Sequence, residues 1–437
     1  MVIQFIPCLG CLPWAWKRCC RVGSDDSKHW PLTTLEEFEP VPRICRLILS
    51  VYEGDLSCPR FTPIAGYGIN LGWIVKRVYY GQTLGRTPPY FIYTDHTNRE
   101  IVLAIRGLNL GSASDYAIML DNRSGMQMFD GGFVHHGFLK SAIWLLNQES
   151  ETLKTLWSET GCSYKMVFAG HSLGSGVAAL LTTVVVNHLN RFGGIPRSLI
   201  RCYAVAPARC MSINLAVKYA DVINSVVLQD DFLPRTSTPL EDHFKTICCM
   251  PFFFFAVWMR DVYFSKRNLH DPRRLCPPGR LYHIVERQFC RCGRFPPEVR
   301  TACPVDWRFE QVILSCNASS DHEIIWIARE AQRALDLLVE AEGNLTVPPR
   351  EQRLERNYAL RVAQNDAMKT VSMDGLYVQP MPESTEADGN LISQTGALES
   401  PKSGLNSSGQ TNWDVLYEEI FERNELGKLT LKETVLC

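Results

Sequence analysis

The stretch that most constrains this chain runs from Tyr164 to Ala178 and reads YKMVFAGHSLGSGVA. Its first half, Tyr164–Ala169, is short and apolar, which predicts a buried strand. The small, apolar residues of Leu173–Val186 follow and predict a buried helix. The turn between them carries the pattern G-x-S-x-G, with Ser172 at its centre. At a strand-to-helix turn this pattern predicts a nucleophilic serine, and the alternative is a chance match in a loop rich in glycine and serine.

The residues next to Ser172 suit such a turn. Gly170 and Gly174 have no Cβ atom, so the strand and the helix can approach each other closely. The N–H of Leu173 begins the helix, where it has no partner within the helix and lies at the positive end of the helix dipole. We therefore expect it to stabilise an oxyanion, the charged oxygen that forms when a nucleophile attacks a carbonyl group.

The composition favours a large globular protein. The 437 residues are 46% hydrophobic and 21% charged, which is enough for one large domain with extensions. The net charge of −1 lacks the basic excess that phosphate binding needs, so we expect no nucleic acid partner. The 17 cysteines are scattered, and the C-x-C pair of Cys290 and Cys292 has no matching second pair. We therefore expect reduced cysteines in a cytoplasmic protein, and no metal site.

Strand and helix patterns alternate through the middle of the chain. This alternation predicts an α/β fold with a mostly parallel central sheet flanked by helices. The stretch between 108 and 132 is polar, and we expect it to be mobile. The remaining expected strands are 91–93, 101–105, 200–205, 222–228, 280–285 and 309–314, and the remaining expected helices are 44–49, 137–158, 213–219, 323–339 and 413–421.

We divide the chain into three regions. Residues 1–90 form an N-terminal region, and residues 91–345 form the main domain with an apolar insertion at 236–280. Residues 346–437 are charged and then rich in serine, glycine, asparagine and proline, a composition that predicts a disordered tail.

Two segments suit a membrane surface. Residues 1–21 combine Trp14 and Trp16 with basic residues, and packing of this segment on the domain is an equal alternative. The insertion has an apolar run at its centre, Ile247–Met259, which contains Phe252–Phe255 and is too short to span a bilayer. We favour a lid or a membrane-contacting loop over a buried core segment. The cysteines near these segments are candidates for acylation: Cys8, Cys11, Cys19, Cys20, Cys248 and Cys249.

A serine nucleophile needs a base, and the base needs an acid to orient it. In α/β-hydrolases these groups follow the serine in the order acid, then histidine. Asp230 and Asp231 come directly after the expected strand 222–228, at the edge where such a sheet presents catalytic groups. We favour Asp231 as the orienting acid, with Asp230 as the competing choice.

Four histidines follow the acid along the chain. His322 lies in a loop just before an expected helix, which suits a base at the edge of the sheet, and we favour it. His283 lies inside a strand pattern and is expected to be structural. His243 lies in the insertion and His270 in a basic loop. We expect His171, inside the elbow, to point away from the site because Ser172 occupies the apex of the turn.

A second oxyanion donor should come from the loop after an earlier strand. The backbone N–H of Leu108, just after the expected strand 101–105, is placed for this role. Asp115 would brace the loop, or would be an ordinary surface acid.

These residues together resemble the class 3 lipase family, which contains fungal triacylglycerol lipases and animal and plant diacylglycerol lipases. The resemblance spans roughly residues 90–340, and the segment Glu36–Arg43 resembles plant members known as calmodulin-binding heat-shock lipases. The matching pieces are Ile105–Gly107, Val134–Phe138, Gly170–Gly174, Asp231–Arg235 and Asp321-His322.

The resemblance implies an α/β-hydrolase fold and hydrolysis of acylglycerol esters. It implies Ser172 as the nucleophile, Asp231 as the orienting acid and His322 as the base. Many family members have threonine or serine where this chain has Leu108, so here the backbone would hold the oxyanion without a hydroxyl group.

The sequence therefore predicts a peripherally membrane-associated serine lipase that needs no cofactor and takes diacylglycerol or triacylglycerol. A phospholipase A1 or a general carboxylesterase is the alternative within the same chemistry. The rival from another class is an adaptor that binds calmodulin or a membrane, for which the basic stretch 350–369 is the candidate segment. A solvated charged helix is the simpler interpretation of that stretch, and a complete set of catalytic groups argues against an adaptor.

Overall fold

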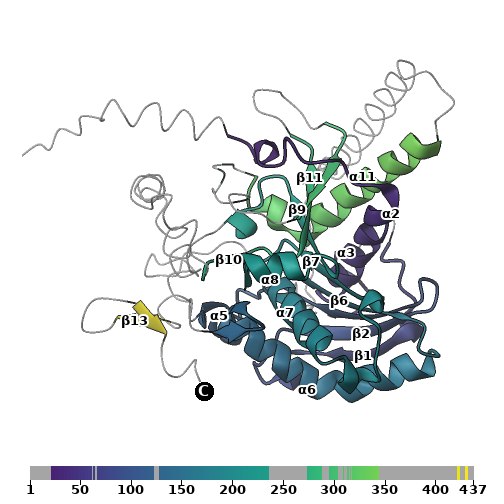
Figure 1. Ribbon diagram of the computed structural model, residues 1–437, viewed down its shortest axis with the longest axis vertical. Coiled ribbons are helices and arrows are strands. Elements are labelled where there is room, and N and C mark those ends of the chain that lie inside the picture. Colours follow the sequence, from purple (N-terminus) through teal and green to yellow (C-terminus); the bar gives the residue numbers. More distant parts are fainter. Residues whose placement is uncertain are drawn as a thin grey trace, which may run out of the picture. The chain divides into compact units, whose positions relative to one another are not determined.

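The computed structural model describes residues 21–61, 63, 66–122, 127–235, 273–287, 295–303, 309, 313, 315, 317–343, 421–423 and 429–431 (Figure 1). The described residues up to Val339 belong to one compact unit, and Glu340–Lys432 belongs to a second. In the second unit, β13 (Phe421–Arg423) and β14 (Leu429–Leu431) form an antiparallel hairpin. None of the described helices is long and apolar enough to cross a lipid bilayer.

The first unit is built on an eight-stranded sheet. Its strand order is β1-β2-β3-β6-β7-β9-β11-β12. The five strands from β3 to β11 pair in parallel, and β1, β2 and β12 pair antiparallel at the two edges. The strands are β1 (Ile74–Val78), β2 (Tyr90–Asp95), β3 (Glu100–Ile105), β6 (Lys165–His171), β7 (Ile200–Val205), β9 (Ile223–Leu228), β11 (Arg280–Val285) and β12 (Glu298–Ala302).

Helices cover both faces of this sheet, and Figure 1 shows α3 and α11 on one side and α6 and α7 on the other. The alternation of side chains along a strand gives each face its own core. Along β7, Tyr203 faces α3 (Pro40–Ser50), whereas Cys202 faces α7 (Leu173–Asn187), where it interacts with the side chain of Thr182. The prediction of a mostly parallel sheet flanked by helices is confirmed.

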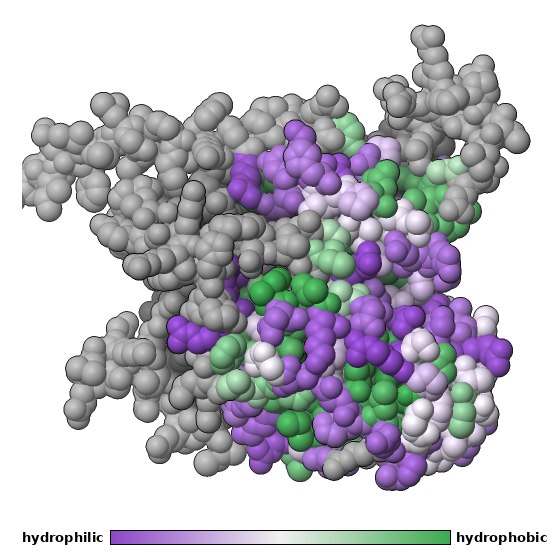
Figure 2. Space-filling model, viewed as in Figure 1, coloured by the Kyte–Doolittle hydropathy of each residue, from purple (hydrophilic) through white to green (hydrophobic). Residues whose placement is uncertain are grey.

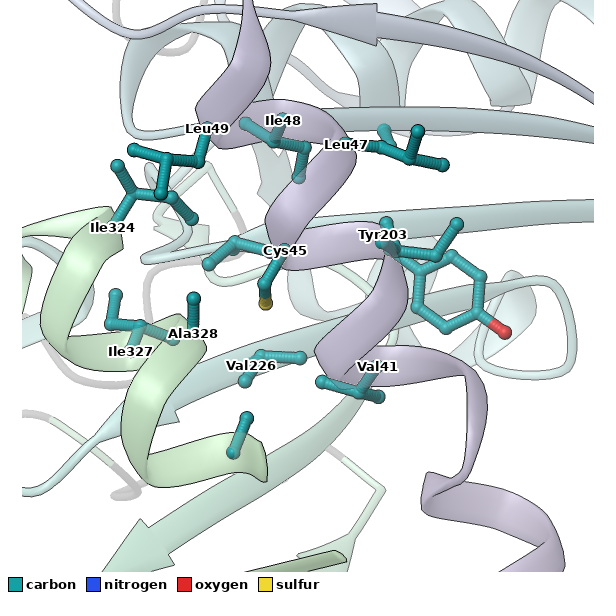
Figure 3. Close-up of a cluster of buried hydrophobic side chains, with 14 of the residues drawn as sticks. Val41, Cys45, Leu47, Ile48, Leu49, Tyr203, Val226, Ile324, Ile327 and Ala328 are labelled. Carbon is teal, nitrogen blue, oxygen red and sulfur yellow. The ribbon is translucent and has the colours of Figure 1, made fainter. Parts of the chain in front are cut away.

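The core on the α3 side of the sheet joins the N-terminal region to the last helix of the domain along the chain. In Figure 3, Cys45 and Ile48 of α3 lie among Ile327 and Ala328 of α11 (Ile324–Gly343) and Val226 of β9. All five side chains are buried. Burying an aliphatic side chain of this size contributes about 1.5–3 kcal/mol, so this cluster anchors α3 firmly on the sheet.

The remaining elements are short, apart from α6 (His136–Glu159), which packs against α7. Thr34 caps α2 (Leu35–Phe38) by accepting a hydrogen bond from the N–H of Glu37. The other short elements are α4 (Tyr80–Thr83), α5 (Ala113–Leu120), α8 (Ile213–Lys218), β4 (Met128–Phe129), β5 (Gly132–Phe133), β8 (Met211–Ser212) and β10 (Leu275–Cys276).

Two expectations about local structure are wrong. The stretch between 108 and 132 was expected to be polar and mobile, but it contains α5 and the hairpin of β4 and β5. Tyr116, Ile118 and Met119 of α5 are buried, and this burial gives the helix its stability. Among the described residues the last strand of the sheet is β12, and the predicted strand at 309–314 is wrong at Phe309, which lies in a turn.

Several predictions fall on residues outside those that the structure describes. These are the N-terminal segment 1–20, nearly all of the insertion 236–280, most of the strand 309–314, and the segments 350–369 and 413–420. The predicted helix at 413–421 is wrong at its last residue, because Phe421 begins β13.

The surface of the described residues is mixed in polarity. Figure 2 shows green apolar areas interspersed among purple polar ones on the face in view. Large exposed apolar side chains such as Leu84, Met128 and Leu32 come from separate segments. Apolar residues exposed singly are common on soluble proteins and indicate no particular partner.

Candidate active site

Ser172 lies at a sharp turn between β6 and α7. Its φ of 54° and ψ of −120° are uncommon for a residue other than glycine. A Cβ atom on Gly170 would lie 2.2 Å from the carbonyl oxygen of Gly174, and one on Gly174 would lie 2.3 Å from that of Arg106. Because neither position has room for a side chain, both glycines allow the strand, the helix and the loop after β3 to meet at Ser172.

The structure brings Ser172, His322 and Asp231 into one chain of hydrogen bonds. His322 Nε2 lies 2.9 Å from Ser172 Oγ, and His322 Nδ1 lies 2.9 Å from Asp231 Oδ1. A carboxylate only accepts hydrogen bonds, so Nδ1 carries the proton and Nε2 presents its lone pair to the hydroxyl of Ser172. Asp231 is fully buried and Ser172 is 9% exposed. This geometry can deprotonate a serine.

Local structure fixes both partners of the serine. Asp231 follows β9, and its Oδ1 atom also accepts a hydrogen bond from the N–H of Leu233 at 3.0 Å. His322 ends the 3₁₀ turn Ser320–His322 just before α11. Its imidazole packs between the rings of Phe232 and His171, with ring centroids 4.8 and 5.1 Å away. Asp231 and His322 are therefore held by their own loops as well as by each other.

Asp230, the competing acid, points elsewhere. Its Oδ1 accepts a hydrogen bond from the N–H of Gly23 at 2.7 Å, and its Oδ2 lies 3.5 Å from the guanidinium of Arg287. Arg287 also pairs with Asp321, whose Oδ2 accepts a hydrogen bond from the N–H of Asp230 at 3.0 Å. Arg287 therefore links Asp230 and Asp321, the residues just before Asp231 and His322. This link aligns the loop after β9 with the turn before α11.

Of the other histidines that follow the acid, His283 is structural. It lies in β11, where its two nitrogens contact Ser27 Oγ at 2.8 Å and the carbonyl oxygen of Gln229 at 2.9 Å. Burial lowers its pKa from 6.5 to about 3. His243 and His270 lie outside the described residues.

This shift predicts that His283 makes folding sensitive to acid. Its pKa is lower in the folded state than in the unfolded chain, so its contribution to stability is fully present above about pH 6.5 and is lost as the pH falls towards 3. Between pH 7 and pH 5 the loss amounts to about 2 kcal/mol. We expect urea unfolding, followed by circular dichroism, to show that the wild type loses this much more stability than His283→Gln. Equal losses of stability in the two proteins would contradict a lowered pKa of His283 in the folded state.

The two backbone groups expected to bind an oxyanion flank the elbow. Leu173 begins α7, and Leu108 lies in the loop after β3. Within the described residues, neither N–H donates a hydrogen bond, so both are available to a ligand. Gly107, which precedes Leu108, abuts the elbow, since a Cβ atom there would lie 3.0 Å from the carbonyl oxygen of His171. The loop after β3 therefore contacts the turn that carries Ser172.

Asp115 braces the loop after β3. It lies in α5, where it is buried and accepts hydrogen bonds from the N–H of Asn109 at 2.9 Å and from the hydroxyl of Tyr80 at 2.7 Å. Its burial raises the pKa of the carboxyl group. Of the two roles that the sequence allowed for Asp115, the structure therefore supports the bracing one.

Sequence reasoning missed two contributors to the site. Arg235 is fully buried and donates hydrogen bonds to the carbonyl oxygens of Asp231, at 3.1 Å, and Gln229, at 2.8 Å, which shapes the loop of the acid. Tyr52 contacts the ring of His171 from a position 119 residues away along the chain. Arg235 ends the segment Asp231–Arg235 that carries part of the family resemblance, which could have drawn attention to it, whereas no local pattern pointed to Tyr52.

No group of three or more His, Cys, Asp or Glu side chains in the described part of the chain is arranged to hold a metal ion.

The sheet order, with a strained serine between a parallel strand and a helix, defines an α/β-hydrolase. Two family models match the sequence. Class 3 lipase matches residues 102–241, and the lipase 3 N-terminal region matches residues 2–69. These two matches support assignment of the chain to a class 3 lipase family.

Curated relatives in this family include two mammalian enzymes. Diacylglycerol lipase-beta of Mus musculus is 28% identical over 162 residues, which cover 35% of this chain and 23% of the relative. Diacylglycerol lipase-alpha of Homo sapiens is 26% identical over 156 residues, which cover 34% and 14% of the two chains. The match therefore spans less than a quarter of the length of either relative.

Solved structures of similar chains include two fungal lipases. The triacylglyceride lipase of Rhizomucor miehei is 16% identical, covers 67% of this chain and 95% of its own, and has a TM-score of 0.42. The lipase of Rhizopus microsporus var. chinensis is 15% identical, covers 67% and 87% of the two chains, and has a TM-score of 0.44. Because these scores are below 0.5, the fold assignment rests on the strand order and the elbow.

Proposed function

We propose that this protein is a serine lipase that hydrolyses acylglycerol esters through an acyl-enzyme. The observation that carries the proposal is the pair of 2.9 Å contacts that links Ser172 to His322 and His322 to Asp231 at a strained elbow. Membership of a lipase family supports ester hydrolysis over amide hydrolysis. Contacts among all three groups also weigh against an adaptor, which would not need them.

The geometry supports a two-step reaction. Ser172 Oγ attacks the ester carbonyl carbon while His322 Nε2 takes the hydroxyl proton. The C–O bond to the leaving alcohol then breaks, and the alcohol leaves with that proton. Water next attacks the acyl-enzyme and gives its proton to His322. The fatty acid leaves as Ser172 Oγ regains the proton, so the enzyme returns to its starting state.

The buried carboxylate of Asp231 serves both steps. It keeps the proton of His322 on Nδ1, and it stabilises the imidazolium that forms during each attack. The N–H groups of Leu108 and Leu173 are our candidates for holding the negative oxygen of the tetrahedral intermediate. Each donor of this kind typically contributes about 3–4 kcal/mol to transition-state stabilisation. This chemistry needs no metal or organic cofactor.

The substrate class is the part of the proposal that relies on relatives. Both mammalian relatives are named diacylglycerol lipases, so we propose diacylglycerol or triacylglycerol as the substrate. We further propose a cytosol-facing protein that binds a membrane surface peripherally. That part rests on the tryptophans of residues 1–21 and on Phe252–Phe255, and calmodulin binding at 350–369 is likewise proposed from sequence alone.

A substrate panel tests this proposal. Purified wild type is assayed on diacylglycerol, triacylglycerol, phosphatidylcholine and a short-chain p-nitrophenyl ester, with Ser172→Ala as the blank. We expect kcat/KM on at least one acylglycerol to exceed that on the phospholipid and on the short ester. A preference for phospholipid would establish a phospholipase A1 instead, a preference for the short ester a general carboxylesterase, and no excess over the blank would exclude an esterase.

A further inference from the structure

Three hydrogen bonds connect four segments of the chain beside Ser172. The N–H of Gly107 donates to the hydroxyl oxygen of Tyr52 at 2.6 Å. That hydroxyl lies 2.7 Å from Nδ1 of His171, and Nε2 of His171 lies 2.7 Å from the carbonyl oxygen of His322. The chain of bonds thus runs from the loop after β3, through the N-terminal region and the elbow, to the backbone of the base.

Every proton in this network has one possible position. The carbonyl oxygen of His322 only accepts, so Nε2 of His171 carries a proton. Burial lowers the pKa of His171 from 6.5 to about 3, so the ring is neutral and its Nδ1 accepts the hydroxyl proton of Tyr52. The oxygen of Tyr52 then accepts from the N–H of Gly107. Each group therefore makes the bond that its chemistry allows, and a partly buried network satisfied in this way resists displacement.

Close packing leaves this network little freedom. A Cβ atom on Gly107 would lie 2.6 Å from the hydroxyl oxygen of Tyr52 and 2.8 Å from Nδ1 of His171. The guanidinium of Arg106 lies 4.7 Å from the centre of the Tyr52 ring, within range of a cation–π interaction. Tyr52 itself follows α3, which is anchored by the buried core shared with α11. The hydroxyl is thus held by the sheet, by the loop after β3 and by the N-terminal region.

We propose that Tyr52 and His171 are positioning residues that fix the backbone of the base His322 relative to the oxyanion donor Leu108. This inference rests on the proposed function, because it assigns a role in that reaction. Leu108 directly follows Gly107, so a shift of the Gly107 N–H moves the N–H of Leu108 with it. Neither positioning residue is a hydrogen-bond partner of Ser172 Oγ or of the ring nitrogens of His322 among the described residues. The N-terminal region then supplies part of the catalytic apparatus as well as part of the core.

Removing the hydroxyl of Tyr52 tests this role. Tyr52→Phe keeps the ring but leaves the N–H of Gly107 and Nδ1 of His171 without their partner. Since small displacements of catalytic groups cost up to about 100-fold in rate, we expect kcat to fall by about 10- to 100-fold. We expect KM to change by less than about threefold, because the network lies behind the reacting groups and not in the substrate site.

Two further variants separate positioning from general stability. Tyr67→Phe removes a hydroxyl from the same region, where it donates to Glu53, and should lower the melting temperature without lowering kcat. His171→Gln retains an N–H for the carbonyl oxygen of His322, whereas His171→Leu does not. We therefore expect the glutamine variant to retain more of the wild-type kcat than the leucine variant.

The outcomes distinguish this inference from the function it rests on. Wild type no faster than Ser172→Ala on every ester would overturn the proposed function, and the inference with it. Active wild type with Tyr52→Phe at an unchanged kcat would overturn the inference alone. The inference would also be overturned if Tyr67→Phe lowered kcat as much as Tyr52→Phe does at the same loss of melting temperature. Equal activity of the two His171 variants would overturn it as well.

Discussion

Replacing Ser172 with alanine is expected to lower kcat on the best ester substrate by about 10⁶-fold. Loss of a serine nucleophile has this effect because His322 and Asp231 then have no group to activate. The variant should fold normally, since the Oγ atom makes its hydrogen bond only to His322 among the described residues. The measurement is initial-rate hydrolysis at saturating substrate, together with thermal unfolding of the same preparations.

Ser141→Ala provides a matched control. Ser141 is a buried serine in α6, and its hydroxyl donates a hydrogen bond to the carbonyl oxygen of Arg86 at 2.7 Å. Its removal should cost about 1–2 kcal/mol of stability and leave kcat within about twofold of wild type. If Ser172→Ala retained more than a hundredth of the wild-type kcat, another group would have to be the nucleophile.

The second large effect is expected at Asp231. In a buried site, Asp231→Ala removes the acceptor of the His322 Nδ1 proton and one acceptor of the N–H of Leu233. The imidazole then loses its fixed tautomer and the charge that stabilises its protonated form. We expect kcat to fall by about 10⁴-fold, with a smaller change in KM.

The neighbouring Asp230 supplies the comparison. Asp230→Ala removes a buried carboxylate from Gly23 and Arg287 but leaves the contact between Asp231 and His322 in place. It should destabilise the fold and lower kcat by less than about tenfold. Steady-state kinetics of both variants under conditions where both are folded checks this. Equal losses at the two positions, or the larger loss at Asp230, would reverse the assignment of the acid.

The parallel core of the fold could be predicted because its residues carry the signal locally. The strands β6, β7, β9 and β11 are short apolar runs buried on both faces, and each is bounded by turns or helices. The sequence placed each of their ends within two residues. The pattern around Ser172 then predicted which edge of the sheet carries the active site. The order of catalytic groups along the chain reduced the candidates for the orienting acid to two adjacent residues, Asp230 and Asp231.

The elements and contacts that the sequence did not predict share a different physical origin. The edge strand β12 alternates buried and exposed residues over five positions, too few to stand out from a loop. The helix α5 is stabilised by packing against α6, which its own short sequence does not indicate. Tyr52 reaches His171 only because α3 packs on the sheet, and His171 itself turns to the carbonyl oxygen of the base. Tertiary packing determines these features, and the local sequence pattern contains no information about that packing.

The central claim is that Ser172 is the nucleophile of an ester hydrolase. Its most direct test is reaction of the wild-type protein with a fluorophosphonate, followed by peptide mass spectrometry of the adduct. We expect a single phosphonylated residue, Ser172, in the wild type, and much slower labelling of His322→Ala than of the wild type. An adduct on a different residue, or no adduct on folded wild type, would contradict it.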